Sequence, residues 1–165
     1  MQYPRKIRNY NGFVDGRSYA GRVTKGELPE LKLMTADHRG GGMDTSIAQD
    51  MGMEALKAKL SFAEHTPALI NLLGTVIPLT LRAAAQGETA TDVDAHVYTL
   101  RGRVTGLMPG TLETGNDTPL ELELGLHMFR YAVNGDDLID IDIEAGKRVI
   151  GGIDQLASMR LAMGL

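Results

Sequence analysis

The residues that most often carry enzyme chemistry are sparse in this chain and are not grouped. The four histidines lie far apart, without the spacing of a helical zinc site: His38, His65, His96 and His127. The absence of cysteine excludes thiolate nucleophiles, disulfide scaffolds and cysteine-based zinc or iron–sulfur sites. No Gly-x-Ser-x-Gly segment occurs, so the sequence also lacks the nucleophile elbow of hydrolases.

Two segments come close to a binding motif and fail at specific residues. Gly21 and Gly26 have the spacing of a phosphate-binding loop, but Glu27 stands where that loop requires lysine. The alternating acids at 140–144 lack the glycine that a calcium loop needs, and Gly151 stands where the bidentate glutamate would be. We therefore expect no catalytic residue, no cofactor and no metal, and we predict that the protein is not an enzyme.

The composition is typical of a soluble globular chain that does not bind nucleic acid over its whole surface. At 165 residues the chain fits one domain and can bury roughly 70% of its unfolded surface. The net charge is −4, tryptophan is absent and aromatic residues make up 5%, which disfavours phosphate binding and base stacking. No apolar run reaches the roughly 18 residues of a membrane span, so there is no signal for membrane insertion.

Residues 38–62 have the pattern of a hairpin arm that leaves the body of the domain. Gly40, Gly41 and Gly42 give the backbone freedom that side chains prevent, and a long segment with alternating polarity follows them. In that segment Asp50 and Glu54 precede an apolar set on the same face, which predicts a strand that is buried at one end only. The alternative interpretation is an ordinary surface turn.

The longest uninterrupted strand signal runs from Pro119 to Val133, where leucines alternate with polar residues. At about 3.4 Å per residue this strand would span roughly 50 Å. A compact chain of this length has a diameter of only about 40 Å. The strand must therefore bend sharply or extend past the body, and an extended strand needs a partner chain to cover its backbone. The pattern thus indicates oligomerisation.

Two short helices are predicted beside the strands. Residues 66–74 begin with a threonine that can cap the helix and a proline suited to its first position, and end at a glycine. The second helix spans 153–164, with Asp154 as its cap and Gly164 at its end. Both are short, so they must dock on a sheet or on a neighbouring chain.

The tally of strands far exceeds that of helices and predicts a mainly β fold. Asp15-Gly16 and Asn134-Gly135 are typical two-residue hairpin turns, which favours antiparallel pairing. We expect a single domain over residues 1–165, built as an antiparallel β-sandwich or barrel with a short flanking α-helix and a C-terminal helix.

Several segments, in order and at matching spacing, resemble the major tail tube protein family of contractile-tailed bacteriophages and R-type pyocins. The resemblance runs nearly end to end and is weakest from about residue 75 to 118. It is carried by Gly-Phe-Val-Asp-Gly-x-Ser-Tyr-Ala-Gly (12–21), Leu-Pro-x-Leu (28–31), Arg-Gly-Gly-Gly-Met-Asp (39–44), Asp-Met-Gly-Met-Glu-Ala-Leu (50–56) and Gly-Ile-Asp-Gln-Leu-Ala-x-Met-Arg (152–160).

The resemblance implies two packed sheets with a flanking helix, and self-assembly of six copies into stacked rings. Two long hairpins from each copy would join a continuous inner barrel of twenty-four strands, a closed form that removes strand edges. A contractile sheath would surround the tube, with a baseplate and a tail terminator at its ends. Tape measure protein or double-stranded DNA would occupy the lumen without specific binding.

An acidic wall would let DNA pass because it repels phosphates. We therefore expect the polar face of the long strands to line the lumen, with four candidates: Asp50, Glu54, Glu121 and Glu123. The alternative is that these acids only solubilise the exterior. The expected contacts between subunits or rings are Arg39, Gly40, Gly41, Gly42, Met43, Asp44, Met51, Met53, Leu156, Met159 and Arg160.

Other functions stay open at this point. The tube of bacterial type VI secretion shares the same plan, and a DNA-free tailocin would use the same protein as a membrane-piercing tube. A small β-barrel that binds an apolar ligand is a different class, and it would stay monomeric. For the tube we expect a location in the virion or tailocin particle, assembled in the host bacterial cytoplasm.

Overall fold

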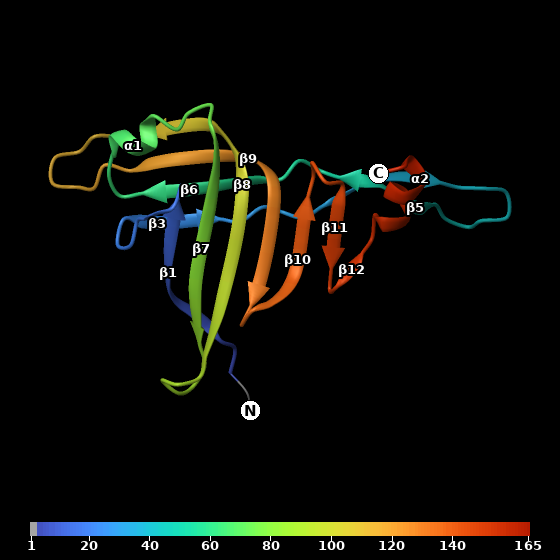
Figure 1. Ribbon diagram of the computed structural model, residues 1–165, viewed down its shortest axis with the longest axis horizontal. Coiled ribbons are helices and arrows are strands. Elements are labelled where there is room, and N and C mark those ends of the chain that lie inside the picture. The colour runs from blue at the N-terminus through green and yellow to red at the C-terminus, as the bar shows by residue number, and fades with distance from the viewer. Residues whose placement is uncertain (1–2) are drawn as a thin grey trace.

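The computed structural model describes residues 3–165, so the first two residues of the predicted domain lie outside the described part. The chain is almost entirely β-structure with two short helices, which confirms the predicted mainly β class (Figure 1). The strands are β1 (Lys6–Val14), β2 (Arg17–Ser18), β3 (Val23–Glu27), β4 (Leu33–His38), β5 (Ile47–Met53), β6 (Lys57–Phe62), β7 (Val76–Gln86), β8 (Val93–Pro109), β9 (Leu120–Val133), β10 (Asp136–Asp142), β11 (Lys147–Ile150) and β12 (Ile153–Asp154). The helices are α1 (Pro67–Ile70) and α2 (Ala157–Met163).

Ten of these strands form one antiparallel sheet. Its main path is β12-β11-β10-β9-β8-β7-β1-β2, while β6 pairs with both β3 and β9. The remaining two strands, β4 and β5, pair only with each other and project as an arm (Figure 1). The backbone of every strand is thus paired on at least one side within the described chain.

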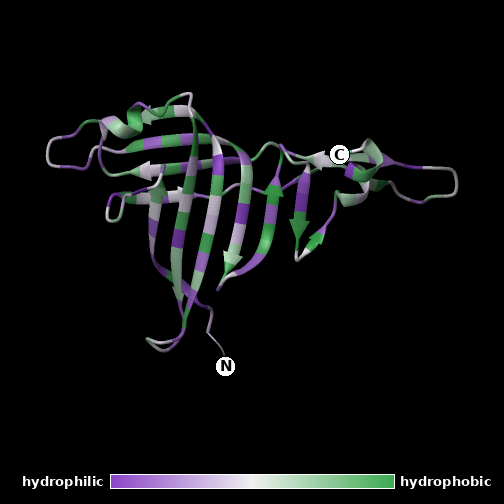
Figure 2. Cartoon of the chain, in the orientation of Figure 1, coloured by the Kyte–Doolittle hydropathy of each residue, from purple (hydrophilic) through white to green (hydrophobic). Residues whose placement is uncertain are grey.

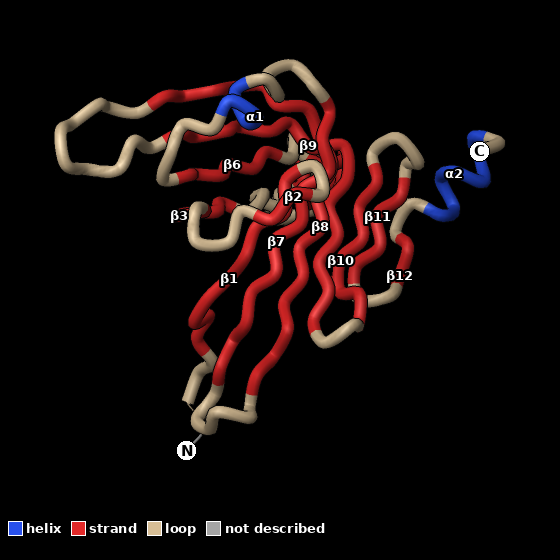
Figure 3. The backbone as a smooth tube through the Cα atoms, turned by 60° about the vertical axis from the view of Figure 1, so that its left-hand side comes forward, coloured by secondary structure: helices blue, strands red, loops and turns tan. Residues whose placement is uncertain are grey.

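The ten-stranded sheet folds over itself into two layers because β8 and β9 bend and belong to both. The large layer contains β1, β2, β7, the first part of β8, the second part of β9, and β10 to β12. The four-stranded layer contains β3, β6, the first part of β9 and the last part of β8. Figures 1 and 3 show the two sets of strands crossing at a steep angle, as in orthogonal sheet packing.

The bend is produced by two bulges and a close backbone contact between β8 and β9. His127 is an extra residue on β9 and Thr105 is an extra residue on β8. The register between the two strands therefore shifts twice over a few residues. Between the bulges Gly102 lies against Gly125, where a Cβ at Gly102 would stand 2.3 Å from the Gly125 carbonyl oxygen. Only glycine permits this close approach of the two backbones. The long strand predicted at Pro119–Val133 therefore bends and does not extend past the body, which is one of the two predicted alternatives.

The core lies between the two layers and consists mainly of leucine. Alternate residues of β9 and β7 are almost fully buried: Leu120, Leu122, Leu124, Ile77, Leu79 and Leu81. The alternating hydrophobic and hydrophilic bands along the strands in Figure 2 show the same period of two. Tyr19 and Phe62 meet edge to face with ring centroids 5.4 Å apart. Each such side chain stabilises the fold by about 1.5–3 kcal/mol relative to an exposed one.

Both predicted hairpin turns are confirmed. Asp15 and Gly16 have φ of 49° and 76° and join β1 to β2. Asn134 and Gly135 have φ of 51° and 93° and join β9 to β10, also as a turn with two left-handed residues. These turns match the twist of the strands that they connect, which is why the dipeptides were informative.

The predicted limits of the arm, 38–62, are wrong. The predicted strand is interrupted between β5 and β6. β5 belongs to the arm, and β6 belongs to the four-stranded layer. The arm consists of residues 33–53, and the three glycines form its tip instead of a hinge at its base. Alternating polarity could not reveal the break, because β5 and β6 have the same period and differ only in their partners.

The helices and the longest strand also differ from the prediction. The first helix is one turn, Pro67–Ile70, and the second begins at Ala157 because Ile153–Asp154 pairs with β11 as β12. Gly164 ends the second helix with φ of 78°, as predicted. The longest strand is β8 with 17 residues, which exceeds the 14 of β9, because the bulge at Thr105 lets β8 follow the bend.

The bend gives the first testable prediction. Gly102→Ala should destabilise the chain by about 1–3 kcal/mol, because its Cβ would overlap the backbone of Gly125. Gly125→Ala is the matched control, since its Cβ would meet only the Thr105 methyl group at 3.4 Å. Urea unfolding of the unassembled chain, followed by circular dichroism, measures both. Equal midpoints for the two variants would contradict this account of the bend.

Candidate assembly interface

The four-stranded layer ends in two strands with free edges. Among the described residues, β3 pairs with β6 alone, and the last part of β8, residues 105–109, pairs with β9 alone. The pairing of β7 with β8 stops at Val76, opposite Arg103. Free edges carry unpaired backbone N–H and C=O groups, so another strand can add to them.

Polar side chains, most of them charged, cover the face of this layer that points away from the core. The pairing aligns them in two rows across the strands: Lys25, Ser61 and Glu121 in one, and Glu27, Lys59 and Glu123 in the other. Lys25 Nζ lies 2.5 Å from Glu27 Oε1, and Ser61 Oγ donates to Glu121 Oε1 at 3.3 Å. This face carries both signs of charge and suits contact with water better than packing on an apolar partner.

The four acids predicted to line a lumen lie in different places. Glu121 and Glu123 share the charged face just described. Glu54 follows β5 and lines, together with Glu123 and Lys59, a groove of about 450 Å³ beside that face. Asp50 lies on the arm, where it binds Arg148. The structure therefore brings three of the four acids together and separates Asp50 from them.

The arm has one polar face and one face that is mostly apolar. The pairing places Thr35 opposite Asp50 and Asp37 opposite Ala48, and these residues make the polar face. The other face carries four apolar residues, Met34, Ala36, Ile47 and Met51, together with His38 and Gln49. Met51 is 61% exposed and Ile47 59%, so nothing in the described chain covers this apolar face. Because a lone two-stranded hairpin is marginally stable in water, the arm is suited to packing on another molecule.

The tip of the arm holds the glycine-rich segment, Arg39 to Asp44. Arg39 Nε donates to the Met43 carbonyl at 3.2 Å, and the amide of Gly40 lies 3.2 Å from Met43 Sδ. Gly42 has a φ of 85°, which an L-residue rarely adopts. These contacts close the turn on itself and leave its side chains on the surface, away from the body.

The base of the arm is tied to the large layer by one ion pair. Arg148 on β11 is only 6% exposed, and its guanidinium binds the carboxylate of Asp50 on β5. The amide of Gly52 also donates to Asp50 at 2.8 Å. Arg148, and next the Gly52 amide, hold the pKa of Asp50 below its ordinary value.

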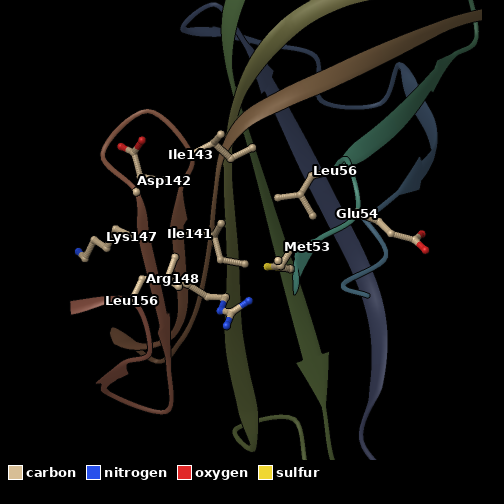
Figure 4. Close-up of a pocket in the computed structure, with 11 residues that line it drawn as sticks. Met53, Glu54, Leu56, Ile141, Asp142, Ile143, Lys147, Arg148 and Leu156 are labelled. Atoms are coloured by element: carbon tan, nitrogen blue, oxygen red, sulfur yellow. The ribbon is translucent and has the colours of Figure 1, made fainter. Parts of the chain in front are cut away.

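An apolar cavity of about 230 Å³ lies beside this ion pair, between the base of the arm and the large layer. Figure 4 shows Met53, Leu56 and Ile141 around it, with the Arg148 guanidinium near Met53. Leu156 lines the same cavity. Met53 and Leu156, both predicted as contacts between subunits, thus contribute to packing within one chain.

The C-terminal helix presents most of its surface to solvent. None of its residues is buried, and Met159 is exposed. Arg160 turns back to bind the Asp154 carboxylate and the Gly146 carbonyl, the latter at 2.8 Å. Arg160 lowers the pKa of Asp154 to about 2. The predicted capping role of Asp154 is therefore wrong, because no side chain caps this helix and Asp154 forms this ion pair.

Arg148 was missed by the sequence analysis. It lies on the inward face of its strand, opposite Ile141, where the alternation predicts an apolar residue. Its partner Asp50 is 98 positions away in the chain. No spacing rule connects residues so far apart, so only the fold reveals this pair.

Residues 3–165 contain neither a metal-binding cluster nor a membrane-spanning helix. No group of three or more histidine, aspartate or glutamate side chains could hold a metal ion in the described part of the chain. Neither described helix is long and apolar enough to cross a membrane.

Comparison with known proteins gives consistent results at the level of sequence. The family described as phage tail tube protein FII matches residues 4–164. The chain is 27% identical over 172 residues to the tail tube protein of Escherichia phage P2, with 100% of both chains covered. It is also 27% identical over 149 residues to the major tail tube protein of Serratia phage KSP20, with 87% of this chain and 85% of the relative covered.

Two solved structures share the fold at low sequence identity. One is a chain of the sheath–tube complex of the extracellular contractile injection system PVC in its extended state. It has a TM-score of 0.57 and 15% identity, covering 81% of this chain and 93% of that one. The other, from the baseplate of the anti-feeding prophage, has a TM-score of 0.53 and 14% identity, covering 80% and 97%. At these identities the likeness shows a common fold.

The ion pair at the base of the arm gives the second prediction. Asp50→Asn should lower the hydrogen-exchange protection of β5 and leave that of β6 unchanged, because the neutral side chain no longer pairs with Arg148. Acid should act in the same way. The depressed pKa stabilises the attached arm above pH 3.8, and this stabilisation is lost as the pH falls further through the lower pKa.

Glu54→Gln is the control for this variant, since Glu54 pairs with Lys32 at 3.4 Å where both side chains are exposed. We expect it to leave the exchange of β5 as it is. Equal protection of β5 in wild type and Asp50→Asn would show that other contacts hold the arm.

Proposed function

This chain belongs to the phage tail tube protein family, with a match over residues 4–164, and on that premise we propose that six copies close into a ring. The protein is a structural component of the tube of a contractile tail or a related particle. We propose further that the rings stack into a hollow tube that conducts DNA in a phage or pierces a membrane in a tailocin.

The observation that carries the ring proposal is the four-stranded layer with two free edges. One edge is β3 and the other is residues 105–109 of β8. If β3 of one copy pairs with this part of β8 in the next, six copies of four strands close a barrel of twenty-four. Closing the barrel pairs the backbone N–H and C=O groups of both edge strands, and no additional strand is needed.

In this arrangement the charged face of the layer lines the lumen. Glu121 and Glu123 are then wall residues, with Glu54 beside them. Lys25 and Lys59 lie in rows that contain an acid, and Lys57, opposite Gly125 on the same face, lines the groove with Glu54 and Glu123. A DNA phosphate backbone gains little binding free energy from lysines that have acids beside them. The wall therefore lets DNA or a tape measure protein slide through without being retained.

Asp50 has a different role in this proposal. Its carboxylate binds Arg148 at the base of the arm and is committed to a contact within the chain. The arm tip, Arg39 to Asp44, and the apolar face with Met51 are free to meet neighbouring copies. Met159 on α2 is another exposed contact for a neighbour.

The other partners follow from the tube itself. We propose that the contractile sheath covers the outside of the stacked rings, and that the baseplate and tail terminator close the two ends. The relatives in fold come from a sheath–tube complex and from a baseplate, which supports this placement. The assembled protein would then be part of a virion or of a DNA-free particle.

Electron microscopy of the concentrated protein tests the ring proposal. We expect hollow rings with six-fold symmetry, or tubes, and a map in which β3 of one copy lies beside residues 105–109 of β8 in the next. A ring closed through other strands would contradict the proposed barrel. A chain that stays monomeric at high concentration and with a baseplate would contradict the tube.

Charge reversal tests the lumen. Tubes of the double variant Glu121→Lys and Glu123→Lys should retain double-stranded DNA. A plot of the logarithm of the binding constant against the logarithm of the salt concentration should have a slope of about −0.9 for each phosphate contacted. Wild-type tubes should not retain it. The control is Glu88→Lys with Asp136→Lys, an equal charge change outside this face. Equal retention by both variants would place the proposed wall elsewhere.

A further inference from the structure

Two of the asparagines in this chain, Asn11 and Asn134, are followed by glycine. An asparagine–glycine pair is the sequence most open to deamidation, because glycine has no Cβ to hinder the attack of its own amide nitrogen. The two pairs lie in different structures. Asn11 lies within β1, whereas Asn134 and Gly135 form the exposed turn between β9 and β10. This turn lies at the end of the large layer away from the four-stranded layer (Figure 1).

The side chain of Asn134 is bound to the start of β8. Its Oδ1 accepts from the amide of Ala95 at 2.9 Å, and its Nδ2 donates to Asp94 Oδ1 at 2.8 Å. The Asn134 amide also donates to the Ala95 carbonyl at 2.9 Å. Arg5, which precedes β1, binds the other oxygen of Asp94 and thereby fixes the carboxylate. We call Arg5, Asp94 and Asn134 the tip clamp.

The tip clamp keeps Asp94 ionised. The side-chain amide of Asn134, and next the Arg5 guanidinium, hold the pKa of Asp94 below its ordinary value. A hydrogen bond to a carboxylate is stronger than one between neutral groups. The nitrogen that deamidation must remove from Asn134 is therefore held by the strongest bond that this side chain makes.

We propose that Asn134 is a deamidation site and that the tip clamp sets its rate. The Gly135 nitrogen attacks Cγ of Asn134 and gives up its proton, and Nδ2 leaves as ammonia. Water then opens the cyclic succinimide at either carbonyl, which gives aspartate or isoaspartate. The hydrogen bond that closes a two-residue turn uses the amide after Gly135, so the attacking nitrogen is not needed for pairing. This inference does not depend on the proposed ring.

The same dipeptide in β1 is protected. Asn11 is half-buried and Gly12 is buried, and both are paired with β7. Asn11 Nδ2 donates to Ser18 Oγ at 3.0 Å. The pairing with β7 fixes the backbone on both sides of the Asn11–Gly12 bond, and burial keeps water from it. We therefore expect Asn11 to react only in the unfolded chain, which makes it an internal reference.

Deamidation of Asn134 damages the turn that carries it. Aspartate at this position places a second carboxylate against Asp94 where a donor stood, and the two like charges repel each other. Isoaspartate adds an atom to the backbone of a turn whose length sets the register of β9 and β10. The reaction thus loosens this hairpin, and the tip clamp limits how fast the folded chain ages.

Peptide mapping tests this inference. The chain is kept folded in mildly alkaline buffer, and samples are cut with trypsin, which releases residues 9–17 with Asn11 and residues 131–147 with Asn134. Mass spectrometry and an isoaspartyl methyltransferase assay measure the converted fraction. We expect conversion in 131–147 alone. Asp94→Ala should convert Asn134 about tenfold faster or more, the factor that one charge-assisted hydrogen bond contributes to a rate.

Asp94→Asn is the matched variant, because its new side-chain carbonyl still accepts from Asn134 Nδ2. It should convert Asn134 much more slowly than Asp94→Ala does. Glu88→Ala removes an acid from the β7–β8 loop outside the tip clamp and should match wild type. The inference is overturned if Asp94→Ala converts Asn134 no faster than wild type, or if Asp94→Asn converts it as fast as Asp94→Ala. Conversion of Asn11 in step with Asn134 would also overturn it, because unfolding of the whole chain would then set the rate.

The first reaction product supplies a second readout that does not depend on rates. Asn134→Asp should lower the midpoint of urea unfolding, because its carboxylate faces that of Asp94. Combining Asn134→Asp with Asp94→Asn should restore most of the midpoint, since the amide and the carboxylate have then exchanged places. An unchanged midpoint in the single variant, or no recovery in the combined one, would argue against the tip clamp.

Discussion

The close contact between the β8 and β9 backbones at Gly102 and Gly125 is the constraint on which the whole structure depends. A Cβ at Gly102 would overlap the backbone of β9, so the strands come together and turn only because glycine is present. The bulges at Thr105 and His127 absorb the change in register. One continuous sheet thereby becomes two packed layers, and a single leucine-rich core fills the space between them.

The bend also gives the two layers different structural roles. The large layer contains most of the paired strands and supports the arm through Arg148, whereas the four-stranded layer keeps two free edges and a charged face. In the proposed barrel this division is useful, because backbone pairing between copies is uniform and does not depend on the side chains that face the lumen. The wall can therefore carry mixed charge without loss of cohesion between subunits.

The arm is the least self-sufficient part of the chain. Two strands with one uncovered apolar face cannot gain enough burial alone, so their order depends on the base and on whatever covers that face. At the base a buried guanidinium, which is costly to leave unpaired, holds the half of β5 that is nearer the body. The arm is thus oriented by its own chain, and in the proposed tube a neighbouring copy covers its exposed face.

The sequence by itself determined what depends on neighbouring residues. Alternating polarity gave the β class and the inward leucines of β9, the Asp-Gly and Asn-Gly pairs gave two turns, and the quoted motifs gave the family. The sequence also pointed to the arm tip and to the charged strand with Glu121 and Glu123, whose part in assembly is a proposal. The limits of the arm, the bend at Gly102 and the Asp50–Arg148 pair were decided only by the tertiary structure. Each depends on which distant strands meet, and a period of two residues is the same whichever partner a strand has.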